Sequence, residues 1–189
     1  MSVTPATDNI AATTLARRHR FQWWEPLPWL KGAEDHPDRP GLLLVTPAVP
    51  ISTPAAFRAW DAGARIPGGA ARLASAHLAD ELRRGLRLDG LMARASVLAA
   101  ANDLAPAAAA VEPALVPFKR ALLRLLARPV GLSGSGPTNW ALYASLAEAA
   151  AGAERLRVAV EQGQLAAPGR PPPFIHATTI LAPAPRREP

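Results

Sequence analysis

The sequence predicts an α+β domain, a ferredoxin-like split βαβ sandwich with extra helices in its first crossover. A continuous apolar run over 41–46, bounded by prolines, is typical of a buried strand. Two short β-rich segments, 129–133 and 138–143, are joined by a glycine-rich turn. An amphipathic helix over about 145–162 precedes an alternating, β-rich segment over 174–181. This order is that of the split βαβ arrangement, and its helices are expected on one face of a mostly antiparallel sheet.

The remaining helices are placed by their start signals and by apolar spacing. Thr53 is expected to be the N-cap of the first helix, with Pro54 in its first turn. A later helix is expected to begin at Pro113, because apolar residues follow it at spacings of 3, 4 and 3 and share one face. The full set of expected helices is 53–61, 71–88, 91–103, the helix that begins at Pro113, and 145–162.

One domain of 25–181 is expected, with an irregular segment over 1–24 before it and a disordered tail over 182–189. The chain has 189 residues, which is enough to bury a core without staples. It has no Cys, which excludes disulfide scaffolds and Cys-ligated metal sites.

The charge is basic, at +6, and arginine supplies 19 of the 21 cations. Such a surface attracts anions such as phosphates, nucleotides or nucleic acid. Interleaved aromatic residues on a basic face are missing, which argues against a nucleic-acid binder. The sequence has no apolar run of about 18 residues and no secretory signal, so we expect a cytoplasmic protein with no membrane span.

The glycine-rich turn is the most informative candidate site. It consists of Ser133, Gly134, Ser135, Gly136, Pro137 and Thr138. Glycines at this spacing let the backbone turn sharply and present bare amides, and the hydroxyls add donors, so the turn is suited to hold a phosphate in a nest of N–H groups. A plain hairpin connection is an equally good interpretation of the same residues.

Two further groups of residues are candidates for a ligand-binding cleft at this turn. Arg120, Arg124 and Arg128 recur every four residues and form a basic stripe, which is expected to end beside the turn and to favour an anionic ligand. A solvated helix face is the alternative. Asn102 and Asp103 end a helix, where they either face a ligand cleft or serve the helix end itself.

Other chemistries find no support in the pattern. His36 and His176 have no second ligand at metal spacing, so no metal site is expected. Ser135 lies in Gly-Ser-Gly, but the five-residue nucleophile elbow and its strand–turn–helix context are missing, which excludes a hydrolase triad.

The string Leu132-Ser133-Gly134-Ser135-Gly136-Pro137-Thr138 resembles the third motif of the GHMP small-molecule kinases. More of the chain, over roughly 25–181, resembles the 4-diphosphocytidyl-2-C-methyl-D-erythritol kinases of that superfamily. The segments that carry this finer resemblance are Glu25-Pro26-Leu27-Pro28, 41–46 with Ile51-Ser52-Thr53, Asn102-Asp103-Leu104 and Trp140-Ala141-Leu142-Tyr143.

The resemblance implies transfer of the ATP γ-phosphoryl group to the 2-hydroxyl of the cytidylated methylerythritol, with Mg²⁺. ATP and magnesium are therefore the implied cofactors, and a small-molecule nucleotide-diphosphate is the implied substrate. The loop would shape the phosphate and substrate end of the cleft.

The chain departs from the family in its first half. The family's catalytic Asp, its Lys and its ATP-binding loop have no counterpart before residue 41. We therefore expect a C-terminal, substrate-side half that has no kinase turnover by itself and binds no ATP alone. The N-terminal half is either a separate chain, which would then be a partner, or lost. The alternative is a standalone ferredoxin-like module that binds an anionic ligand or a protein partner without catalysis.

Overall fold

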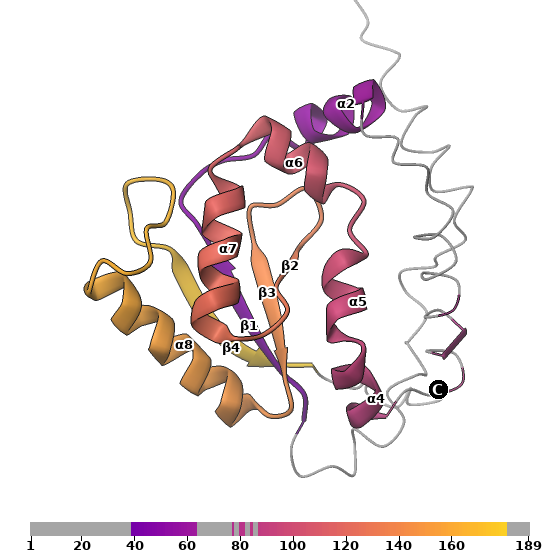
Figure 1. Cartoon of the computed structure of the whole chain (residues 1–189), viewed down its shortest axis with the longest axis vertical. Coiled ribbons are helices and arrows are strands. Elements are labelled where there is room, and N and C mark those ends of the chain that lie inside the picture. Colours follow the sequence, from indigo (N-terminus) through magenta and orange to yellow (C-terminus); the bar gives the residue numbers. More distant parts are fainter. Residues whose placement is uncertain (1–38, 64–76, 78–79, 82–83, 85–86, 181–189) are drawn as a thin grey trace, which may run out of the picture.

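A computed structural model describes residues 39–63, 77, 80–81, 84 and 87–180 (Figure 1). Its strands are β1 (Gly41–Thr46), β2 (Gly131–Leu132), β3 (Asn139–Tyr143) and β4 (Phe174–Thr179). Its helices are α2 (Thr53–Gly63), α4 (Leu88–Ala93), α5 (Ala95–Ala100), α6 (Ala105–Val111), α7 (Leu115–Leu126) and α8 (Leu146–Glu161). The expected segments 1–24 and 182–189 lie outside the described residues, as do two thirds of the expected helix 71–88.

The sheet has the order β2-β3-β1-β4, and every neighbouring pair is antiparallel. The apolar strand β1 lies in the interior of the sheet, where Leu43 is opposite Ala141 of β3 and Ala177 of β4. The hairpin β2–β3 is added at one edge, and β4 returns to the other side of β1. This is the strand order of the split βαβ arrangement, so the predicted fold class is confirmed.

Helices α7 and α8 cover the face of the sheet that is turned toward the viewer in Figure 1. The main core lies between them and the sheet. Leu43 and Val45 point into it from β1, Phe118 and Leu122 from α7, and Leu156 from α8, and each is at most 2% exposed. Burial of each such side chain contributes roughly 1.5–3 kcal/mol, so this layer supplies most of the stability of the described domain.

The opposite face is covered as well, which corrects the expectation that helices lie on one face alone. Leu42 and Leu142 alternate with the residues of the main core and therefore point to the other side of the sheet. They pack there with Leu91 of α4 and Ala95 of α5. The reason is visible in β1, because a strand that is apolar at consecutive positions needs cover on both faces.

The expected helix over 91–103 is two short helices, α4 and α5. They meet at Arg94, whose backbone lies at φ −97° and ψ 3° and whose amide donates to the carbonyl of Leu91 instead of continuing an α-helical pattern. The Arg94 guanidinium is held on two sides, by Glu81 and by the carbonyl of Gly90. The second helix ends at Ala100, before Asn102.

Helix α6 is not among the helices expected from the sequence. In the structure Pro106 lies in the first turn of α6, where a proline costs no hydrogen bond. Alanines fill the rest of the helix, and Ala107 and Ala108 are buried.

The N-terminus of α2 also differs from expectation, because its cap is Ser52 and not Thr53. The Ser52 carbonyl accepts a hydrogen bond from the amide of Ala56, and the Ser52 hydroxyl accepts one from the amide of Ala55.

Candidate functional site

The glycine-rich segment forms the closing loop of the β2–β3 hairpin. Within it the Ser133 amide donates to the Thr138 carbonyl and the Gly136 amide donates to the Ser133 carbonyl, both at 2.8 Å. Gly134 and Gly136 have φ of +53° and +83°, in the left-handed region that favours glycine. The glycines therefore make a turn this tight possible.

Asn102 fastens this loop to the helical layer. Its side-chain amide nitrogen donates to the carbonyls of Leu132 and Gly134, each at 2.8 Å. Its carbonyl oxygen accepts from the amide of Leu104 at 3.0 Å, at the start of α6. One side chain thus joins the end of β2 and the first part of the loop to the α5–α6 connection, and both of its polar atoms are used.

Hydroxyl groups link the loop to β1 and α2. The Thr53 hydroxyl, in the first turn of α2, lies 2.9 Å from that of Ser135. The Thr46 hydroxyl, at the end of β1, lies 2.9 Å from that of Thr138. The loop and the beginning of α2 therefore face one another at one end of the sheet. We define the candidate site as the loop 133–138 together with Ser52, Thr53 and Asn102.

The sequence placed Thr53 at a helix cap and both Thr46 and Thr53 in segments of family resemblance, but it assigned neither residue to the site. The available signal was weak: a hydroxyl residue ends β1 and two more begin α2, which places them at the same end of the sheet.

The loop offers fewer free donors than a full phosphate nest. The amides of Ser133 and Gly136 are used within the turn, whereas those of Gly134 and Ser135 make no hydrogen bond to the described residues. Helix α2 directs the positive end of its dipole toward the same region. Asn139 lies beneath the loop and is 1% exposed; its amide nitrogen donates to the Pro137 carbonyl at 3.0 Å. The site is thus suited to a hydroxyl or one phosphate oxygen.

Arg128 does not lie beside the loop, contrary to expectation. It precedes β2, so it lies at the open end of the hairpin, whereas the loop closes the other end. There Arg128 pairs with Glu148 at 3.0 Å, and its guanidinium lies 4.4 Å from the centre of the Tyr143 ring. Burial raises the pKa of the Tyr143 hydroxyl, and the charge of Arg128 opposes this rise.

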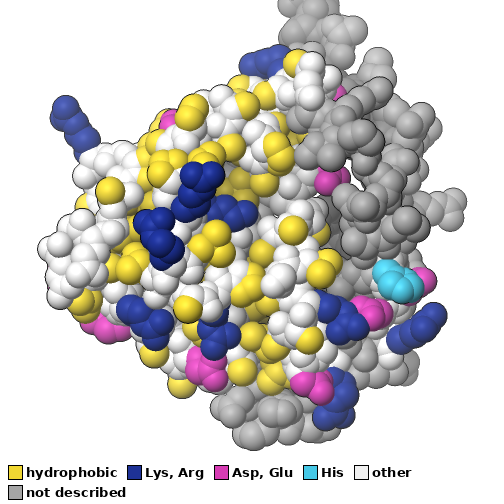
Figure 2. Space-filling view, viewed as in Figure 1, with side chains coloured by type: hydrophobic (Ala, Val, Ile, Leu, Met, Phe, Trp, Pro, Cys, Tyr) yellow, Lys and Arg dark blue, Asp and Glu magenta, His cyan; other side chains and the backbone are white. Residues whose placement is uncertain are grey.

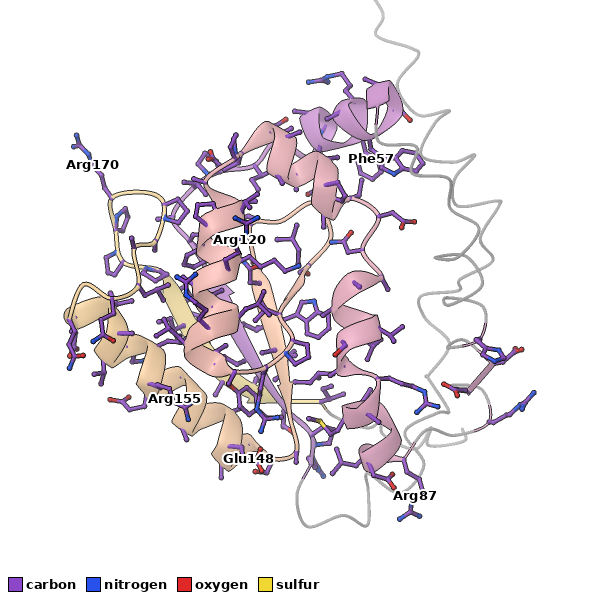
Figure 3. All side chains as sticks on the ribbon, in the orientation of Figure 1. Phe57, Arg87, Arg120, Glu148, Arg155 and Arg170 are labelled. Atoms are coloured by element: carbon purple, nitrogen blue, oxygen red, sulfur yellow. The ribbon has the colours of Figure 1, made fainter. Side chains whose placement is uncertain are left out.

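The other expected residues are also separated from the loop. Arg120 and Arg124 are exposed residues of α7. Figure 3 shows Arg120 on the surface of that helix. Asp103 is exposed and forms no hydrogen bond or ion pair with the described loop residues, although it adjoins Asn102. Of the residues expected around a cleft, the structure thus brings only Asn102 to the loop.

The described residues provide no metal site. Among them no three His, Cys, Asp or Glu side chains lie close enough together to hold a metal ion. In the same part of the chain, no helix has the length and apolar character needed to span a membrane.

No protein-family profile and no curated protein matches the chain. Among solved structures, the chain is similar to the homoserine kinase from Cytophaga hutchinsonii ATCC 33406, with a TM-score of 0.51 and 17% sequence identity. The likeness covers 76% of this chain and 42% of that one, so the chain spans about two fifths of the length of its neighbour. At this identity the likeness shows the fold: the domain is folded like part of a homoserine kinase.

Proposed function

We propose that this chain is the substrate-side part of a small-molecule kinase of the GHMP type. The observation that supports the proposal best is the position of the Ser-Gly-Ser-Gly-Pro-Thr loop. The string that resembles a GHMP motif lies at the closed end of the hairpin, fastened by Asn102 and facing the start of α2. The fold likeness to a homoserine kinase agrees with the resemblance and does not depend on it.

The acceptor in this proposal is 4-diphosphocytidyl-2-C-methyl-D-erythritol, because the finer sequence resemblance is to kinases of that substrate. When bound with Mg²⁺, ATP would supply the transferred γ-phosphoryl group. The residues of the loop would bind and orient the acceptor: the amides of Gly134 and Ser135 are available as donors, and the Ser133 side chain is exposed. The described residues do not form a magnesium site, and no group among them is assigned as the base.

Catalysis then requires a second, ATP-binding half that supplies the nucleotide site and the base. Phosphoryl transfer depends mainly on positioning and on stabilisation of developing charge, so two halves that are not aligned give no turnover. The chain by itself is therefore a binding part of the enzyme and not a complete catalyst.

The test combines the full 189-residue chain with a separately produced ATP-binding half from a complete 4-diphosphocytidyl-2-C-methyl-D-erythritol kinase. Phosphorylated product is followed by ³¹P NMR. We expect product from the mixture with the cytidylated acceptor, none with L-homoserine, and none from either part alone. A covalent fusion of the two parts guards against weak association. If neither mixture nor fusion makes product while the fusion is folded, the proposed function is wrong and a binding module without catalysis is favoured.

A further inference from the structure

The outer face of α7 carries apolar and basic side chains that belong to neither the core nor the candidate site. The inner face of the helix is buried, with Phe118 and Leu122 at 1% and 0% exposure. On the outside, Val116 and Leu123 are both 38% exposed. They are seven residues apart, so they lie on the same side of the helix, two turns from one another. A short apolar stripe therefore runs along the exposed side of α7.

Cations lie on both sides of this stripe. At 100° per residue, Lys119 falls between the stripe and the buried face, while Arg120 and Arg124 fall on the other side of it. Figure 2 shows basic side chains gathered over α7 with apolar atoms around them, and Figure 3 shows Arg120 on the helix surface.

These cations are not neutralised within the part of the chain that the structure describes. The ion pairs found there use other cations, including Arg128 with Glu148 and Arg157 with Glu154. No Asp or Glu occurs anywhere between Glu112 and Glu148 in the sequence. Lys119 is half-buried, and the loss of water around its ammonium lowers its pKa. An incoming carboxylate would replace part of that lost hydration.

We propose that the outer face of α7, formed by Val116, Lys119, Arg120, Leu123 and Arg124, docks an acidic amphipathic helix of a partner protein. An apolar stripe with cations on both sides is the complement of a helix whose apolar seam is flanked by carboxylates, as in the pairing of coiled-coil helices. Arginine also suits carboxylates, because its guanidinium forms two parallel hydrogen bonds with them.

Other anionic partners fit this face less well. The stripe has no aromatic side chain on which a nucleic-acid base would stack. Two half-exposed aliphatic side chains offer little depth for insertion into a lipid surface. The contact is one helix of 12 residues, so the complex belongs to the small, transient class of interfaces. The proposal does not depend on the proposed kinase function, because the face lies on the outer surface of α7 and the loop lies at the end of the hairpin.

The test uses a synthetic helical peptide of about three heptads, with Leu at positions a and d and Glu at e and g. Binding to the full-length chain is measured by calorimetry and mapped by amide NMR. We expect shifts centred on Val116 and Leu123, and an affinity that falls with added salt. The double variant Arg120→Glu/Arg124→Glu should weaken binding by about tenfold or more, and Leu123→Ser by severalfold, because charge pairing and the apolar contact each contribute.

Arg170→Glu is the matched control, since Arg170 is an exposed cation that projects from the loop after α8 (Figure 3). It should leave the affinity unchanged within about twofold. A peptide of the same composition in scrambled order should bind at least about tenfold more weakly, because its apolar seam is lost. Thermal melting of each variant shows whether it remains folded.

Several results would overturn the proposal. One is no binding of the designed peptide. Another is equal binding of the scrambled peptide, or an equal effect of Arg170→Glu, either of which would mean general attraction of acids to a basic protein. A third is tighter binding of phosphatidylglycerol vesicles or of polyuridylic acid through the same residues, which would identify a lipid or nucleic-acid surface instead.

Discussion

Asn102 illustrates how one side chain joins two segments that are far apart in sequence. It uses its amide nitrogen on Leu132 and Gly134, and its oxygen on Leu104. Its neighbour Asp103 is exposed and makes none of these contacts. The sequence alone does not distinguish the two residues, because both are polar and lie at a helix end. The structure shows that Asn102 holds the loop and that Asp103 does not.

Asn102→Ala should lower the free energy of unfolding by about 1–3 kcal/mol, because it removes three hydrogen bonds and leaves the carbonyl of buried Leu132 without its partner. It should also speed amide exchange in the loop, measured by hydrogen–deuterium exchange of Ser133 and Gly136. Asp103→Ala is the control and should change stability by less than about 0.5 kcal/mol. Equal effects of the two substitutions would show that Asn102 does not hold the loop.

Gly136 is the loop position least able to accept a side chain. Its φ is +83°, and a Cβ placed there would lie 3.1 Å from Ile51 and 3.3 Å from Leu132. Gly136→Val should cost roughly 1–3 kcal/mol through backbone strain, with additional crowding. Gly134→Ala is the comparison: it shares a positive φ, but its Cβ meets nothing within 4 Å. Urea unfolding of both variants is the measurement. If Gly134→Ala costs as much, crowding at Gly136 does not matter.

Tyr143 is the chain's single tyrosine, so its ionisation is directly visible by ultraviolet absorbance. Burial raises its pKa above the ordinary value near 10, since the charged phenolate loses its water. The native protein should form tyrosinate only above pH 10, and the urea-unfolded chain near pH 10. A native midpoint at or below that of the unfolded chain would contradict the burial described for Tyr143.

The same shift has a consequence for stability with a definite sign. Above about pH 10 the unfolded chain loses the tyrosine proton while the folded protein keeps it, so the contribution of Tyr143 to stability is complete below that pH and declines above it. The decline should be smaller in Tyr143→Phe.

At the scale of an element, α8 approaches the sheet closely because of Gly152. A Cβ on this residue would fall on the Tyr143 hydroxyl, which is buried and has no hydrogen-bond partner in the described structure. Replacement of a helical glycine by alanine ordinarily stabilises by about 1 kcal/mol. Here Gly152→Ala should instead destabilise, by about 1–3 kcal/mol, because the helix has to move.

The double variant Gly152→Ala/Tyr143→Phe tests the cause of that loss. Removal of the hydroxyl takes away the atom nearest to the new methyl group, although the ring carbon Cζ stays 2.8 Å from it, so the double variant should recover about 1 kcal/mol of the loss. A double variant no better than the single one would mean that the hydroxyl is not the atom that causes the loss. Thermal or urea unfolding of the four proteins gives the coupling energy directly.

The elements that were predicted correctly are those that the local sequence pattern determines. Strand β1 was predicted from a continuous apolar run, and α7 and α8 from apolar residues on one face. Helix α6 was missed because Pro106 marks either the end of one helix or the first turn of another, and only tertiary structure decides. At the break between α4 and α5, Arg94 pairs with Glu81, which is 13 residues away in the sequence.

At the scale of the whole molecule, strand order could be predicted and the placement of charges could not. The order of elements determines the split βαβ topology almost uniquely once crossovers are right-handed and the hairpin is tight. Arg128 precedes β2 and therefore lies at the open end of the hairpin. At that end its guanidinium contacts Glu148 and Tyr143. The loop was identified from its glycines, whereas its links to Thr46 and Thr53 depend on the packing of β1 and α2 beside it.

The central claim is that the loop and the start of α2 form the substrate side of a kinase cleft. The measurement that tests it most directly is an amide NMR titration of the full chain with 4-diphosphocytidyl-2-C-methyl-D-erythritol, with L-homoserine as control. We predict shifts centred on Gly134, Ser135 and Thr53, weakened in Asn102→Ala and absent with L-homoserine. Saturable binding whose shifts leave these three residues unchanged, or no shift at any accessible concentration, would contradict the claim.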